Sequence, residues 1–142
     1  MIGYTTGVFD LFHIGHLYLL KNAKKMCDTL VVGVTTDELA LYKGKKTIIP
    51  FEERIEIVSS CKYVDLVVPQ NNMDKVRACK MLNASVLFVG EDWYGTEKWN
   101  KYEKELSEEG IKVIYLPRIQ KHSSTEVAQK CIEREKNKYK EN

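Results

Sequence analysis

The chain has 142 residues, of which 44% are hydrophobic and 30% are charged, and its formal net charge is +2 at pH 7. These values fit one globular domain with its own core, and so small a charge gives no reason to expect binding to nucleic acid or to a membrane surface. No apolar run is long enough to cross a bilayer, and no signal-peptide pattern follows Met1. We therefore expect a cytoplasmic protein with neither nucleic acid nor membrane as a partner.

The first half of the chain alternates short apolar runs with amphipathic segments. Residues 1–7 predict a strand, and the leucines and alanine of residues 16–26 recur at the spacing of a helix with one apolar face. Residues 29–36 predict a buried strand because β-branched residues dominate them. Pro50 is a start signal for a helix over residues 51–60.

The second half continues the alternation of strand and helix to the end of the chain. Pro69 closes one strand, Gly110 ends one charged helix, and a Ser-Ser-Thr run opens the last helix. The predicted elements are strands at residues 63–69, 85–90 and 111–117 and helices at 73–82, 98–109 and 123 to about 136.

This alternation predicts a single α/β domain over residues 1–142, in which residues 123–142 form a C-terminal helix and tail. Right-handed crossovers make the five-stranded parallel sheet doubly wound, although the pattern leaves the strand order open. Ligands of such sheets bind beyond the carboxyl ends of the strands. The unusual segments of the chain follow predicted strands, so we expect them to meet at one edge.

The segment His-Ile-Gly-His, at residues 13–16, follows the first predicted strand. His13 and His16 are three residues apart at a helix start, so they lie on roughly one face, and Gly15 lets a ligand approach the backbone. The free N–H groups of the helix start and the two imidazoles suit phosphate oxygens, and the alternative is that the histidines only cap a turn. We expect Asp10 to cap this helix or to orient the histidine loop.

A second predicted helix start also suits anions. Arg118 offers a planar fork of donors, and Ser123, Ser124 and Thr125 offer hydroxyl and backbone donors. Two such helix starts at one sheet edge indicate a polyphosphate, such as a nucleoside triphosphate. The alternative is a simple helix cap.

Further candidates follow the other strands. Lys43 and Lys45, on either side of Gly44, predict a mobile basic loop that neutralises phosphate charge, although a solvated charge run is the usual explanation of such a cluster. Asp92 accepts hydrogen bonds, and Trp93 either stacks on a nucleobase or packs on the sheet edge. Arg54 is an ion-pair partner of Glu52, Glu53 or Glu56, or it contacts phosphate.

Several other kinds of chemistry lack their motifs in this sequence. No glycine-rich dinucleotide loop, Walker-type loop or nucleophile turn is present, and the four cysteines lie too far apart in the sequence to indicate a metal site or a redox pair. The implied reaction proceeds by positioning and charge stabilisation without a covalent intermediate, as phosphoryl and nucleotidyl transfer do.

The segment GVFDLFHIGH resembles the first signature of the cytidylyltransferase family, within the His-x-Gly-His nucleotidyltransferases. VVGVTTDE, KGKK, EER, KYVDLVVP, GEDW and LPR followed by SST come in the family's order. The resemblance implies a Rossmann-like domain, usually a homodimer, that transfers CMP from CTP to a small phosphomonoester and releases pyrophosphate. Glycerol 3-phosphate is the favoured acceptor, and Mg²⁺ is expected with the CTP.

The resemblance also implies roles for individual residues. His13 and His16 would stabilise the pentacoordinate α-phosphorus, and Lys43 and Arg118 would join them in catalysis. The residues expected to bind nucleotide are Thr6, Gly7, Val8, Phe9, His13, Gly15, His16, Lys45, Asp92, Trp93, Arg118, Ser123, Ser124 and Thr125. Those expected to bind the acceptor are Asp10, Lys43, Arg54 and Lys62, and no residue is expected to bind a metal directly. The chain departs from the family's usual residues at Val8, Lys62, Ile119, Lys121 and Ser124.

Three alternative functions remain open from the sequence. One changes the acceptor to choline phosphate or ethanolamine phosphate. Another is adenylyl transfer to a sugar phosphate or a flavin. The third is a nucleotide-binding regulatory module without turnover.

Overall fold

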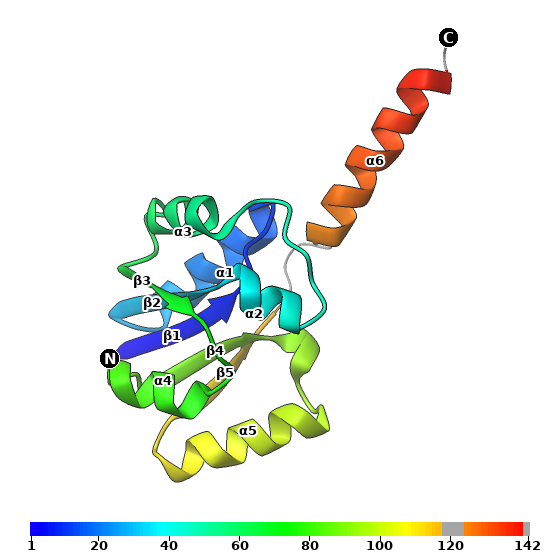
Figure 1. Ribbon diagram of the computed structural model, residues 1–142. Coiled ribbons are helices and arrows are strands. Elements are labelled where there is room, and N and C mark those ends of the chain that lie inside the picture. The colour runs from blue at the N-terminus through cyan, green and yellow to red at the C-terminus, as the bar shows by residue number, and fades with distance from the viewer. Residues whose placement is uncertain (118–123, 141–142) are drawn as a thin grey trace.

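The computed structural model describes residues 1–117 and 124–140 and shows a parallel sheet between two layers of helices (Figure 1). All neighbouring strands are parallel, in the order β3-β2-β1-β4-β5. The strands are β1 (Ile2–Gly7), β2 (Thr29–Thr35), β3 (Leu66–Gln70), β4 (Val86–Gly90) and β5 (Lys112–Leu116). The predicted five-stranded, doubly wound α/β fold is confirmed.

The helices agree with the predicted ones apart from their ends and one addition. They are α1 (Ile14–Lys25), α2 (Asp37–Tyr42), α3 (Phe51–Ser59), α4 (Lys75–Leu82), α5 (Glu97–Glu108) and α6 (Ser124–Lys140), with a 3₁₀ turn, η1 (Glu91–Trp93). The sequence did not predict α2, because six residues are too short to show helical periodicity. The Thr36 side chain caps α2 by accepting from the N–H of Leu39, at 3.2 Å.

Each face of the sheet packs against its own helices. On one face, α1 and α3 bury Leu30, Val32 and Phe88, and on the other, α4 and α5 bury Val31 and Leu87 (Figure 1). Successive residues of β2 and β4 thus enter opposite cores, as the two-residue period of a strand requires. Because both faces are covered, the strands are almost continuously apolar.

The strand order places the topological switch between β1 and β4. From β1 the chain adds β2 and β3 on one side, and it then crosses to add β4 and β5 on the other. Ligands of doubly wound sheets bind beyond the carboxyl ends of the strands at this point. A ligand site is therefore expected at the loops that follow β1 and β4.

The last helix leaves the sheet domain. In Figure 1, α6 projects away from the two helix layers, and the side chains of its residues 129–137 are exposed. Among the described residues, no helix is both long enough and apolar enough to cross a membrane.

Candidate active site at the carboxyl edge of the sheet

The two histidines of the first loop form a stacked pair at the start of α1. Their ring centroids are 4.0 Å apart, with 29° between the ring planes. His13 is the N-cap of α1, and its Nδ1 accepts from the N–H of Gly15 at 3.0 Å. Nδ1 of His16 in turn accepts from the N–H of His13 at 3.1 Å. The two side chains thus make a reciprocal cap, which fixes both rings.

This cap corrects two expectations about α1. The helix begins at Ile14 rather than at His16, and the N–H groups of His13 and Gly15 bond to imidazoles, so they are not free for a phosphate. Because Nδ1 of each ring is an acceptor, the proton of a neutral ring is on Nε2. Each neutral ring thus carries its N–H donor on Nε2, and Nε2 of His13 is buried in this structure.

The His16 ring lies against aromatic side chains of the same loop. Its centroid is 5.5 Å from that of Phe9 and 5.3 Å from that of Phe12. Burial, followed by the charges of His13 and Lys45, lowers the pKa of His16 from 6.5 to about 3, against a smaller opposing effect of Asp10. The ring is therefore neutral at physiological pH, and stacking on His13 brings no repulsion between two cations.

The lowered pKa of His16 predicts a stability that depends on pH. Between about pH 3 and pH 6.5 the unfolded chain binds a proton at His16 that the folded chain does not, so the free energy of unfolding falls as the pH falls through this range. The slope from this one group is at most about 1.4 kcal/mol per pH unit. Urea unfolding at several pH values should show a shallower slope for His16→Asn than for the parent protein. Equal slopes would contradict the lowered pKa.

The loop between β1 and α1 has an unusual backbone. Phe9 and Leu11 have φ angles of 54° and 49°, in the left-handed region that non-glycine residues rarely adopt. A Cβ on Gly7 would come within 2.8 Å of the Phe9 ring, so this fold of the loop needs glycine there. Phe9 itself is buried in the core. Its side chain positions His16, and only its backbone is left for the predicted contact with nucleotide.

Arg54 supports this loop from the protein interior. Its side chain is fully buried and donates to the backbone oxygens of Val8 (2.6 Å), Thr35 (2.7 Å) and Ile49 (2.8 Å) and to Oδ1 of Asp37 (2.7 Å). Its ion-pair partner is thus Asp37, not Glu52, Glu53 or Glu56. Because the guanidinium is committed to these partners, the expectation that Arg54 binds the acceptor is corrected to a positioning role.

Two aspartates hold the segment that leads into α3. Asp10 is buried, and its carboxylate accepts from the N–H groups of Ile48 and Ile49, each at 2.9 Å. Asp37 accepts from Thr47 Oγ1 at 2.9 Å and from the N–H of Phe51 at 3.2 Å. The Arg54 guanidinium, followed by these hydrogen bonds, lowers the pKa of Asp37. Asp10 therefore ties two loops together and does not cap α1, and nothing in the sequence pattern marked Asp37 as a residue that fixes these loops.

The basic loop lies beside the histidine pair. The segment that follows the basic loop is tied to the histidine loop, because Asp10 accepts from the N–H groups of Ile48 and Ile49, and the charge of Lys45 contributes to lowering the pKa of His16. The pKa of Lys43 is lowered first by burial and then by the charges of Lys98 and Lys45. The lysines of this loop therefore interact electrostatically both with His16 at the start of α1 and with Lys98 on α5.

The remaining predicted residues divide into three groups. Asp92 and Trp93 form η1 directly after β4, at the switch point, and the Trp93 side chain is 51% exposed. Lys62 precedes the first residue of β3 and so lies at the amino end of the strands, opposite the carboxyl ends where the candidate site is. Its Nζ lies 5.2 Å from the centroid of the Tyr63 ring. The expectation that Lys62 joins this site is therefore wrong within one chain. Arg118 and Ser123 lie outside the described residues, as do the side chains of Ser124 and Thr125.

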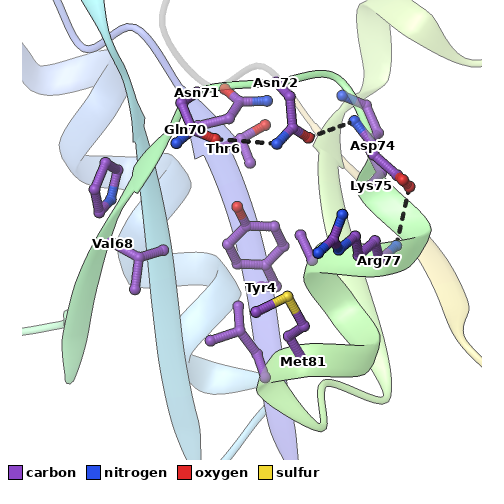
Figure 2. A pocket seen from close by; sticks show the side chains of 13 residues that line it. Tyr4, Thr6, Val68, Gln70, Asn71, Asn72, Asp74, Lys75, Arg77 and Met81 are labelled. Carbon is purple, nitrogen blue, oxygen red and sulfur yellow. Dashed lines mark hydrogen bonds between the residues drawn. The ribbon is translucent and has the colours of Figure 1, made fainter.

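A pocket of about 430 Å³ opens between α4 and the strands beside it (Figure 2). Its polar rim contains Thr6 and Gln70 near the carboxyl ends of β1 and β3, together with Asn71, Asn72 and Lys75. Below them lie Tyr4, Val68 and Met81 (Figure 2). The pocket thus has a polar opening near the candidate site and a largely apolar floor.

The chain is similar to known proteins over most of its length. The model of the cytidylyltransferase-like family matches residues 4–130. A glycerol-3-phosphate cytidylyltransferase of Bacillus subtilis (strain 168) is 38% identical over 124 residues, which cover 87% of this chain and 91% of that protein. An FAD synthase of Archaeoglobus fulgidus is 32% identical over 134 residues, with coverages of 94% and 96%. A solved structure of a lipopolysaccharide core biosynthesis protein from Thermoplasma volcanium aligns with a TM-score of 0.71 at 30% identity, over 87% of this chain and 98% of that one.

Proposed function

Because the chain belongs to the cytidylyltransferase-like family of nucleotidyltransferases, we propose that it transfers CMP from CTP to a small phosphorylated alcohol, with glycerol 3-phosphate as the favoured acceptor. The observation that carries this proposal is the stacked His13–His16 pair at the carboxyl edge of the sheet, in which the lowered pKa of His16 keeps that ring neutral. Two imidazole donors and a nearby cation suit the phosphates of a nucleotide.

In the proposed reaction, a phosphate oxygen of the acceptor attacks the α-phosphorus of CTP. A new P–O bond forms as the bond from the α-phosphorus to the bridging oxygen breaks, and pyrophosphate leaves with that electron pair. The Nε2–H groups of His13 and His16 donate to oxygens on the α-phosphorus, where negative charge increases in the transition state. Lys43 and Lys45 offset the charge of the two reacting phosphates.

The expected Mg²⁺ enters this proposal as part of the substrate. Among the described residues there is no group of three or more His, Cys, Asp or Glu side chains that could hold a metal ion. Mg²⁺ is commonly held by substrate phosphates and water with few protein ligands, so it would arrive with the triphosphate of CTP.

A second candidate is the transfer of AMP from ATP to a flavin phosphate. It is favoured by the FAD synthase relative, whose similarity extends over a larger share of this chain than that of the glycerol-3-phosphate cytidylyltransferase. The two reactions share the attack on an α-phosphorus and differ in the base and in the acceptor.

Pyrophosphate release distinguishes these candidates. The purified protein should be assayed with Mg²⁺ and either CTP or ATP, against glycerol 3-phosphate, choline phosphate, ethanolamine phosphate, a sugar phosphate and FMN. We expect release with CTP and glycerol 3-phosphate. Release only with ATP and FMN or a sugar phosphate would replace the proposal with adenylyl transfer. Tight CTP binding without release from any acceptor would indicate a regulatory module.

The homodimer and the cytoplasmic location stay predictions. The edge strand β3 has an unpaired side among the described residues, and Leu66 on it and Met81 on α4 have exposed fractions of 51% and 74%. Such apolar exposure at a sheet edge is consistent with association of two copies, which light scattering of the purified protein would detect.

A further inference from the structure

Lys75, the first residue of α4, is a buried cation that the proposed reaction does not yet use. Its exposed fraction is 8%, and within residues 1–117 and 124–140 no carboxylate forms an ion pair or a hydrogen bond with it. Burying an ammonium without an anionic partner is costly. The nearby Asp74 caps α4 by accepting from the N–H of Arg77 at 3.0 Å, and its side chain faces solvent.

Aromatic rings compensate part of that cost. Nζ of Lys75 lies 5.3 Å from the ring centroids of both Trp99 and Tyr102, on α5. Nζ of Lys98 lies 5.9 Å from the Tyr102 centroid, so two cations share one ring. Cation–π contacts stabilise each ammonium, but they do not remove the repulsion between them.

Lys43 adds a third positive charge to this group. Burial, followed by the charges of Lys43 and Lys98, lowers the pKa of Lys75 to about 8, against a smaller opposing effect of Cys79. The three lysines come from the ends of three different elements, α2, α4 and α5, and Lys43 is the C-cap of α2. An arrangement that brings three cations together from distant segments favours an anion among them.

The position of this lysine group indicates which anion it would bind. Lys43 is the C-cap of α2, two residues before Lys45, and its charge acts on Lys75 across the carboxyl edge of the sheet. If the triphosphate occupies the histidine side, a second phosphate belongs on the Lys75 side. Lys75 also lines the pocket of Figure 2, whose polar rim includes the Thr6 hydroxyl and the Asn71 side chain, and an alcohol can extend along it.

We propose that Lys75, together with Lys43 and Lys98, binds the phosphate of the acceptor, and that the alcohol of the acceptor extends into the pocket beside α4. The identification of the ligand as the acceptor rests on the proposed function, whereas the binding of a phosphate group at this site does not. The site takes a phosphomonoester dianion, and it is distinct from the histidine pair that receives the nucleotide.

The test compares Lys75→Met with Lys75→Arg and with the control Lys80→Met. Methionine keeps an unbranched stem against Trp99 and removes the charge, whereas arginine keeps the charge. Lys80 lies on the same helix, but it is exposed and paired with Glu109 at 3.3 Å. We expect Lys75→Met to raise KM for the acceptor about tenfold or more, with KM for CTP within about twofold, and we expect Lys75→Arg to recover most of the loss. A rise in KM for CTP instead, or an unchanged KM for the acceptor, would overturn the proposal.

A second measurement does not depend on turnover. Inorganic phosphate should raise the Tm of the parent protein and of Lys80→Met, and this rise should be lost in Lys75→Met. Without phosphate, Lys75→Met should melt no lower than the parent, because it removes a buried charge that has no anionic partner among the described residues, and this shows that the variant is folded. An equal rise in Tm for all three proteins would contradict the phosphate site even if transfer of CMP is observed. If no transfer is observed with any acceptor, a rise lost only in Lys75→Met would still support the site.

Discussion

Replacing His16 with alanine is expected to lower kcat about 100- to 1,000-fold, the usual effect of removing one preorganised donor to a developing oxyanion. The His16 ring is held by its bond from the His13 N–H, by stacking on His13 and by contact with Phe9. Its Nε2–H is therefore fixed before the substrate arrives, so no reorganisation is needed when charge builds up on the α-phosphate oxygens. The loss should fall mainly on kcat, with a smaller change in the dissociation constant of CTP.

A matched variant separates the donor from the cap. Asparagine at position 16 supplies an oxygen that can accept from the His13 N–H, but it is too short to place a donor where Nε2 lies. His16→Asn should therefore keep most of the stability that His16→Ala loses at neutral pH, while its kcat falls as far. The measurements are steady-state pyrophosphate release and urea unfolding of both variants. If His16→Asn retained turnover within tenfold of the parent enzyme, Nε2 of His16 would not be the stabilising donor.

The sequence was sufficient to predict the fold because two independent signals agree. The apolar runs have the lengths of buried strands, and the segments between them have helical periodicity with recognisable ends at Pro50 and Gly110. The strand order was not predictable, since each crossover can place its strand on either side of the sheet. The helix α2 was missed because its six residues give no periodic signal, and its cap at Thr36 resembles an ordinary loop residue.

The histidines and the basic loop were identified because several ionisable residues and glycines gather directly after predicted strands, where ligands of parallel sheets bind. The residues that brace them were not correctly assigned, because charge alone does not show whether a side chain faces a ligand or the backbone. Arg54 has the sequence signature of a phosphate contact, yet it is fully buried. Lys75 is the opposite case. A single lysine at a helix start does not indicate a binding site in the sequence, and only its burial against Trp99 in the structure does so.

Replacing Arg54 with methionine is expected to lower the free energy of unfolding by about 3–5 kcal/mol, as removal of one partner from a buried charged network usually does. Methionine fills part of the space, but it leaves the oxygens of Val8, Thr35 and Ile49 without their donor. Each buried acceptor left unsatisfied costs about 1–3 kcal/mol, and partial relaxation of the loops keeps the total below the simple sum. Lysine should recover only part of the loss, because an ammonium cannot reproduce the planar fork that reaches all four partners.

Chemical denaturation of Arg54→Met, Arg54→Lys and the control Arg134→Met measures this effect. Arg134 is exposed on α6, so its replacement should change the free energy of unfolding by no more than about 0.5 kcal/mol. Arg54→Met should also free the Asp37 carboxyl, whose pKa the guanidinium lowers, and the pKa of Asp37 should rise toward its ordinary value. A loss of less than 1 kcal/mol, roughly the worth of one ordinary hydrogen bond, would contradict the bracing role. It would mean that the loops after β1 and β2 keep their positions without Arg54, and that its guanidinium is available for a ligand after all.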